Sequence, residues 1–167
     1  MARKQTTAEK PVADETTARL SADDALEASA FLAQLDRFYR ELDEIYHEAA
    51  RHAGLSDSAF DILYSLMLED GLTQKQLGER GFTAKQTIGS AVRKLEGQGL
   101  VEPAGPGRRN APVRLTDEGR ALVEQRVRPA YHGEQRASEA LSAPERAELA
   151  RLLARYTASL RAELGVS

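Results

Sequence analysis

The chain has no cysteine and no tryptophan among its 167 residues, and only three histidines. The absence of cysteine excludes disulfide bonds and peroxide sensing through a thiol. His47 and His52 are five positions apart and so fall on different faces of a helix, whereas Glu48 and His52 share one face. A metal site would need help from elsewhere, such as His132. We therefore expect surface histidines and no metal.

The motifs of the common enzyme classes are also missing. The sequence has no glycine-rich phosphate cradle, no Gly-x-Ser-x-Gly, no His-Glu-x-x-His and no cysteine nucleophile. Its acidic residues are scattered over predicted helix faces. We expect a protein that is not an enzyme and binds no cofactor, although catalytic sites assembled from distant residues escape such a search.

Long apolar segments are absent as well. No apolar run approaches the length of a membrane span, and the first residues contain no apolar core of a secretory signal. We therefore expect a cytoplasmic protein. Residues 1–24 are polar and have little to bury, which predicts a mobile tail. The remainder is long enough for one compact domain.

What is present begins with two helix starts, ten residues apart. Thr73 to Gln76 and Thr83 to Gln86 each have the capping-box pattern, in which the threonine hydroxyl and the glutamine side chain satisfy each other's backbone amides. Between them, Gly81 would supply the permissive backbone of a tight turn. This order predicts a helix-turn-helix whose first helix is short.

The second helix of this pair has one apolar face and one polar face. The predicted buried stripe is Ala84, Ile88, Ala91, Val92 and Leu95. Gln86, Ser90 and Arg93 fall on the opposite face, flanked by Thr83 and Lys94. Such side chains suit the major groove of DNA, where arginine pairs with guanine and glutamine with adenine. Gly89 within this helix would allow close approach either to DNA or to the preceding helix.

A β-hairpin is predicted next. Leu100–Glu102 and 113–115 read as strands, and the proline- and glycine-rich residues 103–107 as the turn. Arg108 and Arg109 near the tip would reach phosphates or a narrow minor groove, the alternative being a solvated loop. Residues 73–114 hold eight basic and three acidic residues, a net charge of +5, whereas the whole chain carries −3. The positive charge is thus local to the predicted DNA surface.

Apolar helices flank this segment at both ends. One is predicted around residues 25–54 and others over 116–167, with Pro129 kinking the first of the latter. Their apolar positions are Phe31, Leu32, Leu35, Phe38, Tyr39, Leu42, Ile45, Tyr46 and Ala49, then Leu122, Val123, Val127, Leu149, Leu152, Leu153, Tyr156, Leu160 and Leu164. Ser142 to Glu145 would cap the last helix. The pattern indicates intertwined dimerisation, the alternative being packing within one monomer.

Taken in order, these pieces resemble the multiple-antibiotic-resistance regulator (MarR) family. The resemblance is carried by Gly71-Leu-Thr-Gln-Lys-Gln-Leu-Gly-Glu-Arg80, Lys85-Gln-Thr-Ile, Lys94-Leu-Glu-Gly-Gln-Gly-Leu-Val101, Val113-Arg-Leu-Thr-Asp-Glu-Gly-Arg120 and Leu141-Ser-Ala-Pro-Glu-Arg146. It spans about residues 28 to 164. It implies a mainly α fold with a small β-hairpin wing, in which the winged helix-turn-helix of residues 55–115 lies between dimerisation helices over 25–54 and 116–167.

The resemblance also implies function. It predicts a homodimer that reads a pseudo-palindromic operator on double-stranded DNA and releases it when a small ligand binds, most simply as a repressor. The family's recognition helix corresponds to Thr83, Lys85, Gln86, Thr87, Ser90, Arg93 and Lys94, its wing to Arg108 and Arg109, and the preceding helix start to Thr73 and Gln74. The family's acid before the wing arginine is Gly107 here, so an Asp–Arg brace of the wing is missing.

The family's ligand pocket lies between the dimerisation helices and the winged head. The candidates here are Tyr39, Tyr46, His47, Phe60 and Tyr64, whose apolar rings and polar tips suit a phenolic or aromatic carboxylate ligand. The alternative is that these aromatics only form core. At the level of the whole protein, the alternative is a winged helix that binds another protein instead of DNA.

Overall fold

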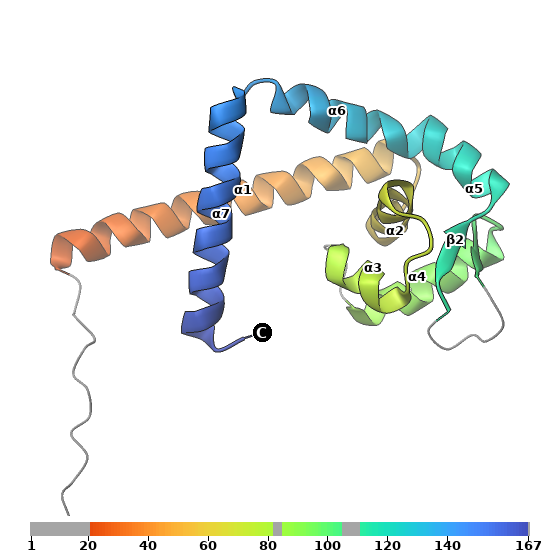
Figure 1. The fold of residues 1–167 in the computed structure, drawn as a ribbon, viewed down its shortest axis with the longest axis horizontal. Helices are drawn as coiled ribbons and strands as arrows, with labels where there is room; N and C mark the ends of the chain where they lie inside the picture. Colours follow the sequence, from red (N-terminus) through yellow and green to blue (C-terminus); the bar gives the residue numbers. More distant parts are fainter. Residues whose placement is uncertain (1–20, 82–84, 105–110, 167) are drawn as a thin grey trace, which may run out of the picture. The chain divides into compact units, whose positions relative to one another are not determined.

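The computed structural model describes residues 21–81, 85–104 and 111–166, which form a mainly helical chain with one β-hairpin (Figure 1). This confirms the predicted fold class. By chain contacts it divides into two units, Met1–Asp43 and Glu44–Ser167. None of the helices in the described ranges has the length and apolar character of a membrane span.

The first helix, α1, extends over Ala22–His52. The Ser21 hydroxyl accepts a hydrogen bond from the amide of Asp24 (3.1 Å), and the Asp24 carboxylate accepts one from the amide of Ser21 (3.3 Å). This reciprocal arrangement satisfies amides that a helix start leaves without partners. The predicted tail over residues 1–24 lies largely outside the described residues, and its last positions already belong to α1.

Three short helices form the head of the second unit: α2 (Asp57–Leu68), α3 (Gln74–Arg80) and α4 (Lys85–Gly97). They gather beside the hairpin in Figure 1. The core between them consists of aliphatic side chains that are almost fully buried, among them Ile62, Leu63, Leu66, Leu72, Leu77, Val92 and Leu95. Ala50 and Ala53 at the end of α1 join the same core.

The capping box at the start of α3 is confirmed. The Thr73 hydroxyl accepts from the Gln76 amide, and the Gln76 side chain accepts from the Thr73 amide at 2.9 Å. The second predicted box, Thr83 to Gln86, stays a prediction, because all of Thr83 and the side chain of Gln86 lie outside the described residues. At Gly81 the expected reason for glycine is wrong, because φ is −90° and ψ is 160°, an extended conformation that any residue adopts. A Cβ there would instead lie 3.3 Å from the Leu77 carbonyl oxygen.

The hairpin pairs β1 (Val101–Pro103) with β2 (Val113–Leu115) in antiparallel register, Val101 opposite Leu115. Gly99, with φ of +71°, ends α4 and turns the chain into β1. Pro103 is the last strand residue and not the first turn residue as predicted, because it pairs with Val113. Val113 also donates its amide to the Leu72 carbonyl (2.8 Å), which attaches the hairpin to the segment before α3.

After the hairpin the chain forms one continuous helical stretch of three parts: α5 (Asp117–Leu122), the π-helical segment η1 (Val123–Val127) and α6 (Arg128–Ser138). Pro129 stands at the first turn of α6. Since proline lacks an amide and its ring crowds the carbonyl four residues earlier, a wider π turn just before it relieves that crowding. Where the sequence predicted a kink at Pro129, the structure has a π-helical segment just before it.

The last helix, α7 (Ala143–Leu164), has the predicted capping box, since the Ser142 hydroxyl accepts from the Glu145 amide and the Glu145 carboxylate accepts from the Ser142 amide. Gly165 ends it in the left-handed conformation. None of its residues is buried in the single chain.

Candidate nucleic-acid interface

Helix α4 has the two faces that its sequence predicts. Its apolar stripe points into the core: Ile88, Ala91, Val92 and Leu95 are all buried. Thr87, Ser90, Arg93 and Lys94 are exposed. The backbone of Lys85 and Gln86 belongs to the helix, but their side chains, like all of Thr83, lie outside the described residues. A cationic and hydroxyl-bearing surface is therefore free on one side of the helix.

Ser90 illustrates what this surface offers a base. Its hydroxyl donates to the Thr87 carbonyl at 2.8 Å, within the helix. The oxygen keeps lone pairs, so Ser90 is available as an acceptor, for example from an amino group of adenine or cytosine. Arg93, one turn along, supplies donors only. Ser90 thus offers an acceptor, and Arg93 offers donors one turn further along the same helix.

Gly89 brings the two helices of the motif together. A Cβ at this position would lie 3.4 Å from Oε1 of Gln74 on α3 and 3.7 Å from a guanidinium nitrogen of Arg93. Of the two roles predicted for this glycine, the structure shows proximity to the preceding helix. The missing side chain leaves room for Gln74 and Arg93 to converge from different helices. Gln74 itself is exposed, and Thr73 is half-buried as the cap of α3.

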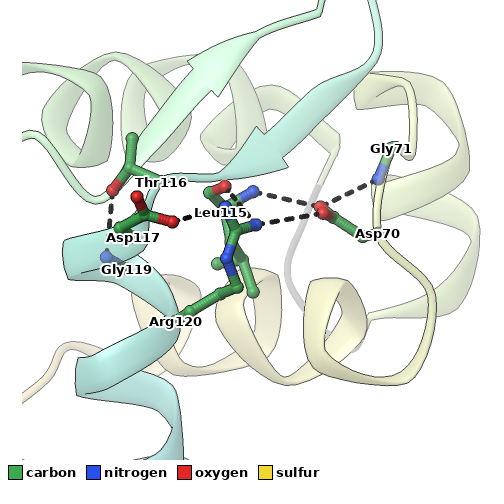
Figure 2. Close-up of polar contacts among 7 residues, drawn as sticks. All are labelled: Asp70, Gly71, Leu115, Thr116, Asp117, Gly119 and Arg120. Carbon is green, nitrogen blue, oxygen red and sulfur yellow. Dashed lines mark hydrogen bonds and ion pairs between the residues drawn. The ribbon is translucent and has the colours of Figure 1, made fainter.

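The base of the hairpin is held by a polar network around Asp70, which the sequence analysis did not find (Figure 2). The Asp70 carboxylate accepts from the amides of Gly71 and Leu115, both at 3.0 Å, and lies 3.6 Å from the guanidinium of Arg120. Arg120 also donates to the Leu115 carbonyl (2.8 Å) and to Asp117 (2.9 Å). Asp70, before α3, and Arg120, on α5, thus clamp the end of β2.

The start of α5 packs against the turn that follows α4. Thr116 caps α5 by accepting from the Gly119 amide (2.9 Å), and its hydroxyl donates to the Gly99 carbonyl (2.6 Å). A Cβ on Gly119 would lie 1.9 Å from the Leu100 carbonyl oxygen. The Leu-Thr-Asp-Glu-Gly sequence thus anchors the hairpin. The predicted wing residues Arg108 and Arg109, and Gly107 before them, lie outside the described residues.

The structure brings two of the predicted ligand residues together. Tyr46 on α1 and Tyr64 on α2 both donate their hydroxyls to the carboxylate of Glu134 on α6, at 3.0 and 2.5 Å. Phe60 is buried and stacks on Tyr64 with ring centroids 6.1 Å apart. Tyr131 also meets the Tyr64 ring edge-on, with ring centroids 6.4 Å apart.

In the part of the chain that it describes, the structure shows no hydrogen bond from the remaining ligand candidates, His47 and Tyr39, to Glu134. His47 is exposed and its Nδ1 lies 3.0 Å from the Asp57 carboxylate at the start of α2. Tyr39 is exposed and belongs to the first unit. Glu134 and Tyr131 were missed in the sequence, where they look like ordinary positions of a polar helix. Only their three-residue spacing, which places them on one helix face, hinted at a shared role.

Neighbouring carboxylates affect the pKa values of the phenols in this cluster. Partial burial, the hydrogen bond to Glu134 and the charges of Glu134 and Asp61 raise the pKa of Tyr46 to about 12. Burial and Glu134 likewise raise the pKa of Tyr64. Both phenols therefore stay protonated at neutral pH and remain donors. Among the described residues, no cluster of His, Asp and Glu has the geometry of a metal site.

Comparison with known proteins gives the same family as the sequence pattern. Residues 53–109 match the family model described as MarR family. A curated relative, an HTH-type transcriptional regulator TtmR from Methylorubrum extorquens (strain PA1), is 33% identical over 79 residues. That match covers 46% of this chain and 40% of the relative.

Solved structures share the fold over most of the chain. A MarR family regulator from Neisseria meningitidis, NMB1585, superposes with a TM-score of 0.71 at 24% identity, over 80% of this chain and 96% of the other. The Mycobacterium tuberculosis MarR family protein Rv2887 in complex with salicylic acid has a TM-score of 0.54 at 27% identity, over 74% of this chain and 93% of the other.

Proposed function

We propose that this chain, whose residues 53–109 match the MarR family model, is a dimeric, DNA-binding transcriptional regulator that represses by occupying a pseudo-palindromic operator. One observation carries the proposal: α4 buries an aliphatic stripe and leaves Thr87, Ser90, Arg93 and Lys94 exposed. A helix of this kind fits the major groove, where Arg93 can read guanine and Ser90 can accept from base amino groups.

The hairpin supplies the second part of the proposed DNA contact. Its base is fixed by Asp70 and Arg120. We propose that Arg108 and Arg109, which lie outside the described residues, contact phosphates or the minor groove. Thr73, Gln74, Thr83, Lys85 and Gln86 complete the proposed surface.

Dimerisation is proposed from the apolar side chains that the single chain leaves uncovered. All but Leu68 and Val166 of the exposed large hydrophobic residues in the described ranges lie on α1 or α7. Exposed apolar surface of this extent on two helices is characteristic of an interface. A twofold dimer would present two copies of α4 to half-sites about one helical turn, roughly 34 Å, apart.

A small aromatic ligand is proposed to release the DNA. Tyr46, Phe60 and Tyr64 supply the aromatic contacts, with His47 and Tyr39 as the further candidates, and the relative Rv2887 was solved with salicylic acid. Lower DNA affinity requires only that the ligand favours a dimer whose recognition helices are wrongly spaced, a coupling of about 1 to 3 kcal/mol.

The experiment is a salt titration of binding to the DNA upstream of the protein's own gene and to random DNA. We expect Arg93→Ala to reduce discrimination between the two sequences, because it removes a base contact. Arg108→Ala should weaken binding to both and flatten the salt slope by about one, because it removes a phosphate contact. Equal effects of the two variants on both DNAs would contradict this division of roles.

The second candidate is a winged helix that binds another protein, since one fold serves many functions. The cationic surface of α4 favours DNA over this alternative. Absence of salt-sensitive duplex binding by the wild-type protein would favour the alternative instead.

A further inference from the structure

The cluster around Glu134 combines aromatic rings with a carboxylate that has no cationic partner. Tyr46, Tyr64, Tyr131 and Glu134 are each half-buried, so each keeps one side toward solvent. Within the described ranges, Glu134 accepts two phenol hydrogen bonds and forms no ion pair with lysine, arginine or histidine. Its charge is therefore neutralised only by dipoles.

The two charges that raise the pKa of the Tyr46 phenol are both negative. The charged groups that act on the Tyr46 phenol are the carboxylates of Glu134 and Asp61. Two basic residues of α6 near Tyr131 bond to other groups: Arg128 pairs with Glu124, and His132, whose ring lies 5.9 Å from that of Tyr131, bonds to Gln135. A ligand that reaches Glu134 would thus meet an unpaired negative charge, which attracts cations and repels carboxylates.

We propose that the Tyr46–Tyr64–Tyr131–Glu134 cluster is the effector site and that Glu134 makes it select aromatic ligands with a protonated amine over aromatic carboxylates. Aromatic faces bind such cations through their ring quadrupoles, and the carboxylate adds a charge-assisted hydrogen bond. Only the role of the ligand as an effector rests on the proposed function, because selection by charge is a property of the site itself. This preference would distinguish this chain from Rv2887, which was solved with salicylic acid.

The same carboxylate connects ligand binding to the winged head. Glu134 lies on α6, while its two phenol donors come from α1 and α2. An ammonium group that bonds to Glu134 competes with these phenols for the carboxylate oxygens. Losing the Tyr64 bond loosens the attachment of α2, and with it the head, to the flanking helices. Cation binding therefore lowers DNA affinity through the contact between Tyr64 and Glu134.

The test uses three probes with the same ring and different charge: benzylamine, benzyl alcohol and benzoate. Binding to the full-length protein is followed by calorimetry and by NMR at neutral pH. We expect benzylamine to bind about tenfold more tightly than benzoate, equivalent to about 1.4 kcal/mol. Benzyl alcohol should lie between them. Benzoate binding as tightly as benzylamine, or no binding by any of the three probes, overturns the inference.

Two variants assign the preference to the carboxylate. Glu134→Gln should abolish the preference for benzylamine. Glu139→Gln makes the same charge change at the exposed residue that caps the end of α6, and it should leave the preference unchanged. Tyr64→Phe removes one phenol donor and should raise benzylamine affinity, an increase that a purely structural role would not produce. Retention of the charge preference in Glu134→Gln contradicts the assignment, and the wild-type probe series does not depend on how any variant folds.

DNA binding measured on the same preparations separates the two proposals. If the wild type binds DNA with salt sensitivity but shows no charge preference among the probes, only this inference fails. If it prefers benzylamine but does not bind duplex DNA, the regulatory function fails and the ligand site stands.

Discussion

Gly119 shows how one residue couples the hairpin to the helix that follows it. A methyl group there would lie 1.9 Å from the Leu100 carbonyl oxygen, and that atom is backbone, with no flexible side chain to move aside. The Gly119 amide is also the group that Thr116 caps. The glycine is therefore required by close approach between α5 and the chain entering β1.

We predict that Gly119→Ala lowers the free energy of unfolding by about 3 kcal/mol, because the clash forces α5 away from Leu100. Urea denaturation measures the change. Gly133→Ala on α6 is the matched control, since a Cβ there meets nothing within 4 Å. It should stabilise the helix by up to about 1 kcal/mol. Equal stability of the two variants would refute the close-packing argument.

Residue patterns also account for much of the candidate site. The exposed positions of α4 were predicted from periodicity alone, because a helix that buries Ile88, Val92 and Leu95 must turn Ser90 and Arg93 outward. Glu134 was not predicted. Its role depends on phenols that are 70 and 88 residues away in the chain, and no local pattern records such a distance.

At the scale of elements, the head depends on how its helices begin. The Thr73 box starts a helix of only seven residues, which is too short to be stable on local hydrogen bonds alone. Its cap and the burial of Leu77 therefore contribute most of what holds it in place.

We predict that Thr73→Ala lowers the free energy of unfolding by about 1 kcal/mol, since the amide of Gln76 loses its acceptor. Thr73→Ser keeps the hydroxyl and should retain wild-type stability within about 0.5 kcal/mol. Chemical denaturation without DNA gives the comparison, so a contact of Thr73 with phosphate does not enter. A loss of the same size in both variants would indicate that the threonine methyl, and not the cap, is responsible.

The sequence pattern predicted the boundary of β1 less precisely than it predicted helix starts. The starts of α3 and α7 were predicted correctly because a capping residue acts within three positions. Pro103 was assigned to the turn from its type, yet it pairs with Val113 in the hairpin. The end of a strand tolerates proline where the backbone amide would have no hydrogen-bond partner in the sheet. Which residue stands at that end depends on the register of the two strands.

For the whole molecule, the main consequence of the structure is the apolar surface that one chain leaves exposed. Leu152, Leu153 and Leu160 on α7 are each more than a third exposed, and Phe31, Leu32 and Leu42 on α1 about half. The alternative to a dimer is that these side chains pack within one monomer. A second copy would remove them from water.

We predict that the protein is dimeric at micromolar concentration and that Leu160→Glu shifts it to monomer, because a charge would be buried in an apolar interface. Sedimentation velocity over a concentration series measures the change. Leu68→Glu is the control, since Leu68 on α2 is an exposed leucine, 55% against 40% for Leu160, and its replacement should leave the dimer intact. A monomeric wild type, or loss of the dimer in both variants, would contradict the proposed interface.

The sequence by itself determined the order of the helices, the starts of α3, α5 and α7 and the two faces of α4, because capping and periodicity act over a few neighbouring residues. Only the tertiary structure decided that Asp70 and Arg120 hold the hairpin and that Glu134 joins Tyr46 to Tyr64. These contacts join residues far apart in the chain. Their partners are selected by how the buried aliphatic faces pack, and the charge of the proposed ligand site follows from that packing.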